Sequence, residues 1–293
     1  MKTNLYTLTA ACCLTLWAAS GCSQSEELPA AGEDRSLMEF NVCHPSQQTS
    51  TRITDTAFED GDKIGVFITE ANELLEPSGN FVNNAALNFN STQWTPDQPI
   101  YWNPGTYQVY AYYPFTQSVS SIDDYPFSLS TDQSTPAGYA QSDFLWAQSP
   151  KVTASNQAVD LSFKHRMSRI LIKLVKGEDY EGDLPATAEV FIHNTVTQAT
   201  IDLSAGIATR NPYASAKSIR AKQLGNNLYT AIVVPQRLDN RLPLVEVIMN
   251  GVSYLYESRF LFKPGIQHAV QLVVSKNPDQ IKIEIGGELE NWT

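Results

Sequence analysis

Apolar and polar residues alternate along most of the chain after residue 36, and this pattern predicts β-strands. Residues 37–43 read Leu-Met-Glu-Phe-Asn-Val-Cys, with Met38, Phe40 and Val42 on one side. Successive side chains of a strand point to opposite faces, so this segment predicts a half-buried strand. The same pattern, or a short β-prone run, predicts further strands at residues 63–68, 81–89, 100–102, 107–113, 143–147, 159–163, 169–176, 188–192, 199–203, 228–234, 244–249, 254–256, 268–274 and 281–285.

Turn signals separate these segments. Phe58 to Asp62 and Trp94 to Asp97 each predict a turn, and Asn250-Gly251 predicts a two-residue hairpin. Residues 116–142 are rich in Ser, Asp and Pro and predict a loop. No window of eleven or more residues beyond the N-terminal segment has a convincing helical period.

The strand spacing predicts an all-β chain of β-sandwiches. About fifteen strands are too many for one small sandwich, so we expect two domains, at residues 37–164 and 165–293. No long linker marks that boundary, and its exact position stays open.

Two details of the strands concern packing. Tyr110 and Tyr112 alternate with Val109 and Ala111, which predicts one aromatic and one aliphatic face. Gly65 lies within a predicted strand, where a missing side chain allows close packing.

The first 21 residues have the pattern of a secretory signal. Lys2 precedes an apolar run from Leu5 to Ala19, which is too short to span a bilayer, and small residues lead to Cys22. The sequence Ala-Ser-Gly-Cys resembles the lipobox of bacterial lipoproteins, in which the cysteine is diacylated. The alternative is an ordinary signal peptide with a chance cysteine.

Residues 22–36 are polar and acidic, with too little apolar surface to fold, and predict a tether. Its opening, from Ser23 to Glu27, resembles the acidic signal that sends some lipoproteins to the outer face of the outer membrane. The alternative for these residues is a plain linker.

Charge and cysteine content narrow the possible partners and bonds. The chain has 20 Lys and Arg against 31 Asp and Glu, a net charge of −11. This acidity argues against nucleic acid or an anionic bilayer as the main partner. If Cys12 and Cys13 leave with the signal and Cys22 carries lipid, Cys43 is the only cysteine left, so no intramolecular disulfide can form.

The sequence offers no motif for catalysis, a metal or a cofactor, so we expect no enzyme. His44, His165, His193 and His268 lie on different predicted strands or strand ends, without metal-ligand spacing. Cys43 and His44 are neighbours in a strand, so their side chains point apart. A triad assembled from residues distant in sequence stays open.

Several segments, in this order, resemble the fimbrillin family, lipoprotein pilin subunits of anaerobic oral and gut bacteria. The resemblance is strong up to about residue 175. The matching segments are residues 51–54 (Thr-Arg-Ile-Thr), 58–67 (Phe-Glu-Asp-Gly-Asp-Lys-Ile-Gly-Val-Phe), 99–102 (Pro-Ile-Tyr-Trp), 109–114 (Val-Tyr-Ala-Tyr-Tyr-Pro), 143–147 (Asp-Phe-Leu-Trp-Ala), 159–165 (Val-Asp-Leu-Ser-Phe-Lys-His) and 168–170 (Ser-Arg-Ile).

The resemblance implies a fold, a cellular location and an assembly mechanism. The fold would be two transthyretin-like β-sandwiches in tandem, anchored by lipid on Cys22 to the outer membrane as a surface-exposed precursor. A protease would cut after Arg52, leaving Ile53 as the new N-terminus. Cutting there removes the strand at residues 37–43, whereas cutting at Arg35 leaves it attached. Another pilin subunit would then insert a strand into the groove, forming a fimbrium that mediates adhesion.

The competing hypothesis is a surface glycan-binding lipoprotein with exposed Trp and Tyr. Trp102 and Trp146 are candidates for such a platform, but core packing is the more common role of large aromatic residues. The sequence leaves open a stalk, tip or anchor role, the adhesion ligand and the identity of the donated strand.

Overall fold

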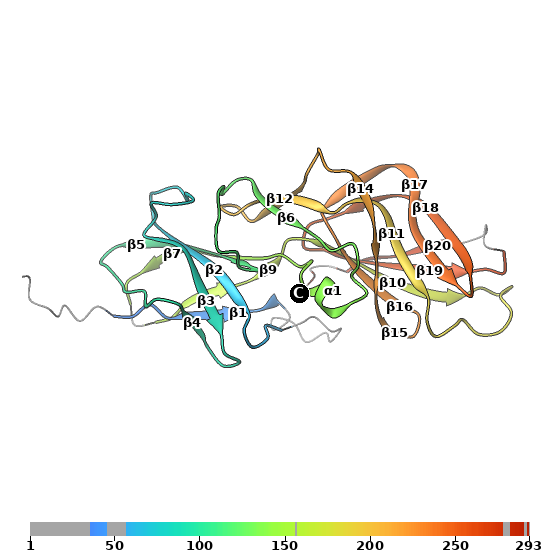
Figure 1. The fold of residues 1–293 in the computed structure, drawn as a ribbon, viewed down its shortest axis with the longest axis horizontal. Helices are drawn as coiled ribbons and strands as arrows, with labels where there is room; N and C mark the ends of the chain where they lie inside the picture. Colours follow the sequence, from blue (N-terminus) through green and yellow to red (C-terminus); the bar gives the residue numbers. More distant parts are fainter. Residues whose placement is uncertain (1–35, 46–56, 156, 278–281, 290–291, 293) are drawn as a thin grey trace, which may run out of the picture. The chain divides into compact units, whose positions relative to one another are not determined.

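The structure, a computed structural model, describes residues 36–45, 57–155, 157–277, 282–289 and 292. Nearly all of its regular elements are strands, so the predicted all-β fold is confirmed (Figure 1). One short helix, α1 (Pro136–Ala140), begins after Thr135, whose side chain accepts a hydrogen bond from the Gly138 amide.

Two sheets are built from the first half of the described chain. The larger has the order β4-β3-β2-β5-β7-β9, and every pair in it is antiparallel. In the smaller, β1 and β8 run parallel. Their bounds are β1 Phe40–Cys43, β2 Lys63–Glu70, β3 Val82–Phe89, β4 Trp94–Pro96, β5 Thr106–Tyr113, β7 Leu145–Thr153, β8 Val159–Ser162 and β9 Lys164–His165.

Two further sheets are built from the second half. One has the order β15-β16-β10-β19-β20, with β10 and β19 parallel, and the other has the order β14-β11-β17-β18. Their bounds are β10 Ser168–Lys176, β11 Glu189–Val196, β14 Ala216–Arg220, β15 Lys222–Gly225, β16 Leu228–Val233, β17 Gln236–Met249, β18 Val252–Phe262, β19 Gln267–Val274 and β20 Lys282–Leu289.

A fifth sheet joins the two halves of the chain. In it, β12 (Gln198–Asp202) pairs with β13 (Ile207–Arg210) on one side and with β6 (Tyr125–Ser128) on the other. The β6 strand precedes the predicted domain boundary and β12 follows it.

Three clusters of buried side chains form the cores. The first core contains Met38, Phe40, Ile64, Val66, Ile68, Leu87, Trp94, Ile100, Trp102, Tyr107, Val109, Ala111, Leu145, Ala147, Val159, Leu161 and Phe163. The second core contains Ile170, Ile172, Leu174, Val190, Ile192, Ile219, Ala221, Tyr229, Ala231, Val233, Leu238, Leu244, Val245, Val247, Met249, Tyr254, Phe262, Val270, Leu272 and Val274.

The middle core takes residues from both halves of the chain. It contains Phe67, Leu75, Tyr110, Tyr112, Ile122, Tyr125, Phe127, Leu129, Tyr139, Phe144, Trp146, Met167, Ala199, Ile201, Leu203, Ala208, Ile232, Val234 and Trp292. The predicted division of the 107–113 strand is confirmed, because Val109 and Ala111 lie in the first core while Tyr110 and Tyr112 lie in the middle core.

The structure also corrects three local predictions. Trp94 to Pro96 is not a turn but the strand β4, and residues 116–142 contain β6 and α1 as well as loops. Residues 100–102 form no strand of their own, since only Tyr101 makes an isolated bridge, to Leu37. The hairpin at Asn250-Gly251 is confirmed between β17 and β18, with φ angles of 50° and 78°.

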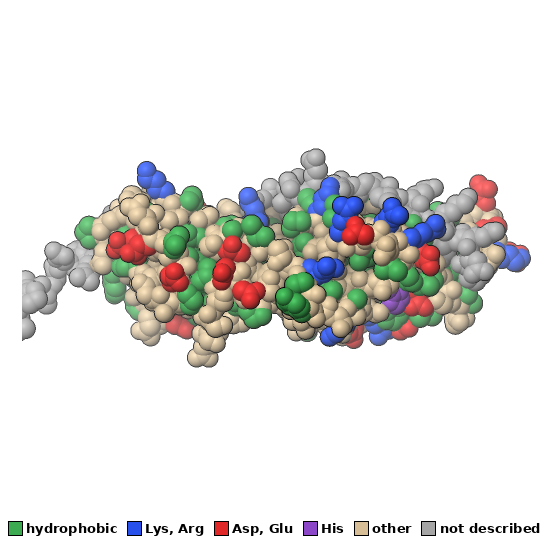
Figure 2. Space-filling view, turned by 90° about the horizontal axis from the view of Figure 1, so that it is seen from above, with side chains coloured by type: hydrophobic (Ala, Val, Ile, Leu, Met, Phe, Trp, Pro, Cys, Tyr) green, Lys and Arg blue, Asp and Glu red, His purple; other side chains and the backbone are tan. Residues whose placement is uncertain are grey.

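Charge is distributed unevenly between the halves. Residues 36–164 carry 4 Lys and Arg against 14 Asp and Glu, whereas residues 165–293 carry 14 against 13. On the face in Figure 2, basic side chains are accordingly concentrated on the C-terminal half. The net negative charge of the chain therefore comes mainly from its N-terminal half and tether.

Candidate assembly site around the first strand

The first described segment lies between two parts of the chain that hold its backbone on both sides. On one side β1 pairs with β8, where the Val159 amide donates to Glu39 O (2.8 Å) and the Phe163 amide donates to Cys43 O (3.0 Å). On the other side the Met38 amide donates to Ile100 O (2.8 Å) and the Trp102 amide donates to Ser36 O (3.0 Å). Residues 36–43 thus fill a slot lined by backbone groups.

The side chains of this segment follow the predicted alternation. Met38 is 1% exposed and Phe40 is 9% exposed, both within the first core, and Val42 packs against it. Glu39 and Asn41 are exposed, and Asn41 Nδ2 donates to Asp160 Oδ1 (2.7 Å). Burying an apolar side chain of this size contributes about 1.5–3 kcal/mol, so Met38 and Phe40 supply much of the stability that holds the segment.

The segment ends at a buried polar cluster. His44 is 3% exposed and makes edge contacts with Phe58 (ring centroids 4.8 Å apart) and His165 (5.9 Å). His165 Nδ1 lies 2.9 Å from Asp143, and its ring stacks on Trp292 at 3.8 Å. Burial is the main cause that lowers the pKa of His44 to about 4. The His165 ring therefore lies between His44, at the end of the first segment, and Trp292.

The predicted lipidation and cleavage residues, Cys22, Arg52 and Ile53, lie outside the described residues. Arg35 and the whole signal segment lie outside them as well. Arg52 falls between Pro45, the last described residue after β1, and Ala57, where the description resumes. The predicted cleavage position therefore belongs to the connection between the first strand and the rest of the first core.

The two tryptophans considered as a glycan platform are core residues. Trp102 lies in the first core and Trp146 in the middle core, where Trp146 Nε1 donates to Leu203 O (2.7 Å).

Within the described ranges no group of three or more His, Cys, Asp and Glu could hold a metal ion. The same ranges contain no helix with the length and apolar character needed to cross a membrane.

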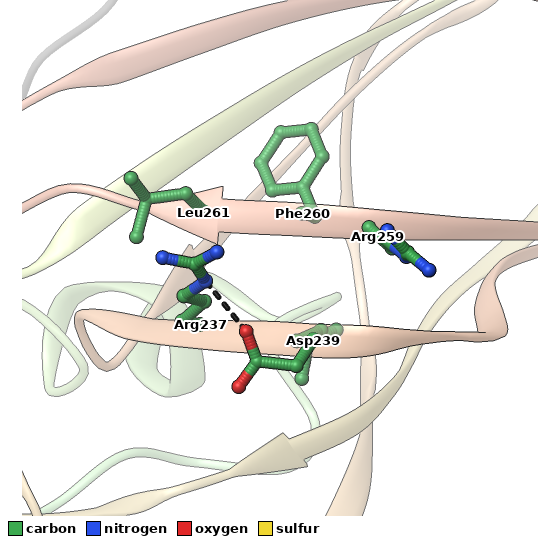
Figure 3. A pocket seen from close by; sticks show the side chains of 6 residues that line it. Arg237, Asp239, Arg259, Phe260 and Leu261 are labelled. Atoms are coloured by element: carbon green, nitrogen blue, oxygen red, sulfur yellow. Dashed lines mark ion pairs between the residues drawn. The ribbon is translucent and has the colours of Figure 1, made fainter.

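A shallow hollow lies between the first residues of β17 and the last residues of β18, which pair with each other. Arg237 and Asp239 of β17 and Arg259 and Leu261 of β18 line it, with a volume of about 460 Å³ (Figure 3). Arg237 Nε forms an ion pair with Asp239 Oδ1 (2.6 Å), and both side chains are 72% exposed. An ion pair this exposed contributes little to stability, and we assign no function to the hollow that it lines.

Comparison with known proteins adds family information to this geometry. A sequence model of a family described as fimbrillin-like matches residues 51–292. A candidate fimbrium tip subunit, Fim1C, from Bacteroides ovatus is 31% identical over 183 residues. That match covers 55% of this chain and 33% of the relative, so this chain spans about a third of the length of that relative.

Two crystal structures have a similar fold. A candidate cell adhesion protein from Bacteroides ovatus superposes with a TM-score of 0.69 at 18% identity, covering 88% of this chain and 97% of that one. A second candidate cell adhesion protein, from Bacteroides uniformis, gives a TM-score of 0.66 at 20% identity, covering 89% and 98%. At these identities the similarity establishes the arrangement of strands.

Proposed function

This chain belongs to the fimbrillin-like family, and from that membership we propose that it is a structural subunit of a surface fimbria that polymerises by exchange of its first strand. The observation that carries the proposal is the position of residues 36–43. They are held by backbone hydrogen bonds on both sides, bury Met38 and Phe40, and are followed directly by the stretch that contains Arg52.

Cleavage after Arg52 would cut the covalent link between this strand and the rest of the chain. Loss of the strand would leave unpaired backbone groups at Val159 and Phe163, and an apolar slot where Met38 and Phe40 had been. An open strand edge with empty side-chain pockets binds an extended segment from another chain. Another fimbrial subunit is therefore the proposed partner.

The precursor would be held at the outer membrane by lipid on Cys22. The support is the sequence alone, a short apolar segment followed by small residues and a cysteine. Two acyl chains give stable anchoring, so the variant Cys22→Ala is expected in the soluble fraction of cells. Continued membrane association of that variant would contradict lipidation.

The two-sandwich arrangement with a boundary at 164/165 is also proposed. In its support, every residue of the first core precedes residue 164 and every residue of the second core follows residue 168. The middle core lies across that boundary and draws on both halves.

Limited trypsin digestion of the folded precursor tests the assembly mechanism. We expect a new N-terminus at Ile53 and a shift to oligomers in size-exclusion chromatography. Arg52→Gln is the matched control and should stay monomeric, while Arg35→Gln should behave as the parent protein does. Stable cleavage at Arg35 alone, or a cleaved monomer with Ile53 at its N-terminus, would overturn the proposal.

The glycan-binding alternative loses the two tryptophans that the sequence offered as its platform. Trp102 and Trp146 are 4% and 8% exposed, so neither offers a ring face to a ligand in solution. A glycan platform on this chain would therefore need other side chains than these two.

A further inference from the structure

A row of hydrogen-bonded polar side chains crosses the solvent-facing side of the β14-β11-β17-β18 sheet. His193 Nδ1 lies 2.6 Å from Ser218 Oγ, and His193 Nε2 lies 2.9 Å from Glu246 Oε2. Ser253 Oγ donates to Glu246 Oε1 (2.6 Å). Each of the four strands thus contributes one member, and the row spans the full width of the sheet.

The strand registers place this row on the outer face. Ile192 and Val247 point into the second core, so their neighbours His193 and Glu246 point outward. Asn194, with φ of 58°, lies in the irregularity between Ile192 and Thr195 of β11. That bulge interrupts the alternation next to His193 and helps to aim its ring toward Ser218 on the adjacent strand.

The row holds its members in one orientation. Hydrogen bonds from Ser253 and His193 lower the pKa of Glu246, so its carboxylate is charged and accepts at both oxygens. Because a carboxylate only accepts hydrogen bonds, His193 donates from Nε2 to Glu246 Oε2. Side chains fixed in this way lose little rotational freedom when a ligand binds them.

A hollow of about 360 Å³ opens above the row. Its polar lining includes His193, Ser218 and Glu246, and Leu255 and Pro243 form an apolar wall beside them. Leu255 is 46% exposed, so it offers apolar surface to a ligand. Lys217 also lines the hollow, so the lining contains one basic and one acidic side chain.

The composition of the hollow suits binding better than catalysis. Serine, histidine and glutamate act together in some hydrolases, which also need hydrogen-bond donors aimed at the reacting oxygen. The side-chain amide in this hollow is that of Asn194, and it donates to Pro243 O (2.7 Å). It is therefore committed to the backbone and not directed at a bound carbonyl.

We propose that this hollow binds a neutral sugar, with the apolar face of the ring against Leu255 and Pro243 and its hydroxyl groups donating to the oxygens of Ser218 and Glu246, which His193 holds in place. Its size suits a ligand of one or two sugar rings. With one basic and one acidic side chain, Lys217 and Glu246, the lining has no excess of positive charge to favour a sialic acid over a neutral hexose or N-acetylhexosamine. The site would serve adhesion, and it does not depend on strand exchange at β1.

The test is saturation-transfer NMR on the folded protein. The probes are the methyl glycosides of glucose, galactose, mannose, N-acetylglucosamine and N-acetylgalactosamine, with N-acetylneuraminic acid as the acidic comparison. We expect transfer to at least one neutral probe. Affinity should be about tenfold weaker in Glu246→Gln, which removes the charge from a hydrogen-bond acceptor, and roughly threefold to tenfold weaker in Ser218→Ala, which removes a neutral one.

Thr209→Ala is the matched control, because it removes a hydroxyl from another cross-strand pair, Thr200 with Thr209 (3.0 Å), on a different sheet. It should bind as the parent protein does, and all variants should keep the parent's circular dichroism spectrum. They should also keep its trypsin-driven assembly, which separates this proposal from the assembly mechanism. Transfer to no neutral probe, or affinity unchanged in Glu246→Gln and Ser218→Ala, would overturn it.

Discussion

His44 places an imidazole in the protein interior directly after the first strand, next to His165 and Phe58. Burial lowers its pKa from 6.5 to about 4. Above pH 6.5 the ring is neutral in both the folded and the unfolded chain. Between pH 6.5 and 4 the unfolded chain binds a proton that the folded chain does not, so stability falls as the pH falls.

We therefore expect the intact protein to lose about 3 kcal/mol through His44 alone between pH 6.5 and 4, at 1.36 kcal/mol per pKa unit. Urea unfolding at a series of pH values measures this loss. Carboxylates also titrate in that range, so His44→Gln is the comparison that isolates the histidine. Parallel pH profiles for the two proteins would show that the imidazole does not carry the effect.

Gly65 is a second residue whose surroundings fix its identity. A Cβ atom there would overlap the ring of Tyr112 and lie 2.8 Å from Asn84 Oδ1. Tyr112 cannot move aside easily, since it is fully buried and its hydroxyl donates to Asn84 Oδ1 (2.8 Å).

Gly65→Ala should therefore lower the free energy of unfolding by about 1–3 kcal/mol, the usual cost of overpacking a core. Gly225→Ala is the matched control, because nothing lies within 4 Å of the added Cβ there. Equal stabilities of the two variants in urea unfolding would refute the clash.

At the scale of elements, the alternation of residues 37–43 was enough to predict both the first strand and its buried side chains. The alternation does not predict the β6 strand, because its two inward residues, Tyr125 and Phe127, lie in a segment rich in Ser, Asp and Pro. The β14 strand was missed because Ile219 is its only fully buried residue, so it shows no alternation. Short edge strands such as these are specified by their partners more than by their own sequence.

The polar row shows a different limit of sequence reasoning. His193, Ser218 and Glu246 are separated by at least 25 residues, and the register of three strands brings them together. The sequence had indicated only that His193 has no partner at metal-ligand spacing. Contacts across a sheet depend on pairing register, which alternation within one strand does not fix.

In the intact chain, the buried side chains of the first strand should determine how often that strand detaches from β8. Substituting Met38 and Phe40 together by Ser should lower the local opening free energy by roughly 3 kcal/mol or more, given 1.5–3 kcal/mol for each buried side chain. Hydrogen exchange should then speed up at least a hundredfold at the Val159 and Phe163 amides, which donate to Glu39 and Cys43 of the strand.

Glu39→Gln is the control for this experiment, since that side chain is exposed and its loss leaves the buried face unchanged. Exchange at Val159 and Phe163 that is the same in the double variant and in the control would mean that backbone pairing alone holds the strand.

At the scale of the whole molecule, the middle core links the two halves thermodynamically. Phe144 comes from the first half and Ile201 from the second, and both are fully buried in it. We expect one unfolding transition in calorimetry, with the calorimetric enthalpy equal to the van't Hoff enthalpy. Phe144→Ala or Ile201→Ala should move that whole transition downward, because each removes about 2–5 kcal/mol.

Leu74→Ala provides the control, since that side chain is 82% exposed. Two resolved transitions, of which each variant shifts only one, would show instead that the halves unfold independently.

The parallel pairing of β1 with β8 has a consequence for any filament the protein forms. A strand from a second molecule that reproduces the hydrogen bonds of Glu39 and Cys43 must run in the same direction as β8. Successive molecules would then all point the same way, and a head-to-tail contact of this kind builds an open filament whenever its rotation does not close a ring. The filament would have polarity, with an unfilled groove at one end and an unused donor strand at the other, so that growth and termination are chemically distinct events.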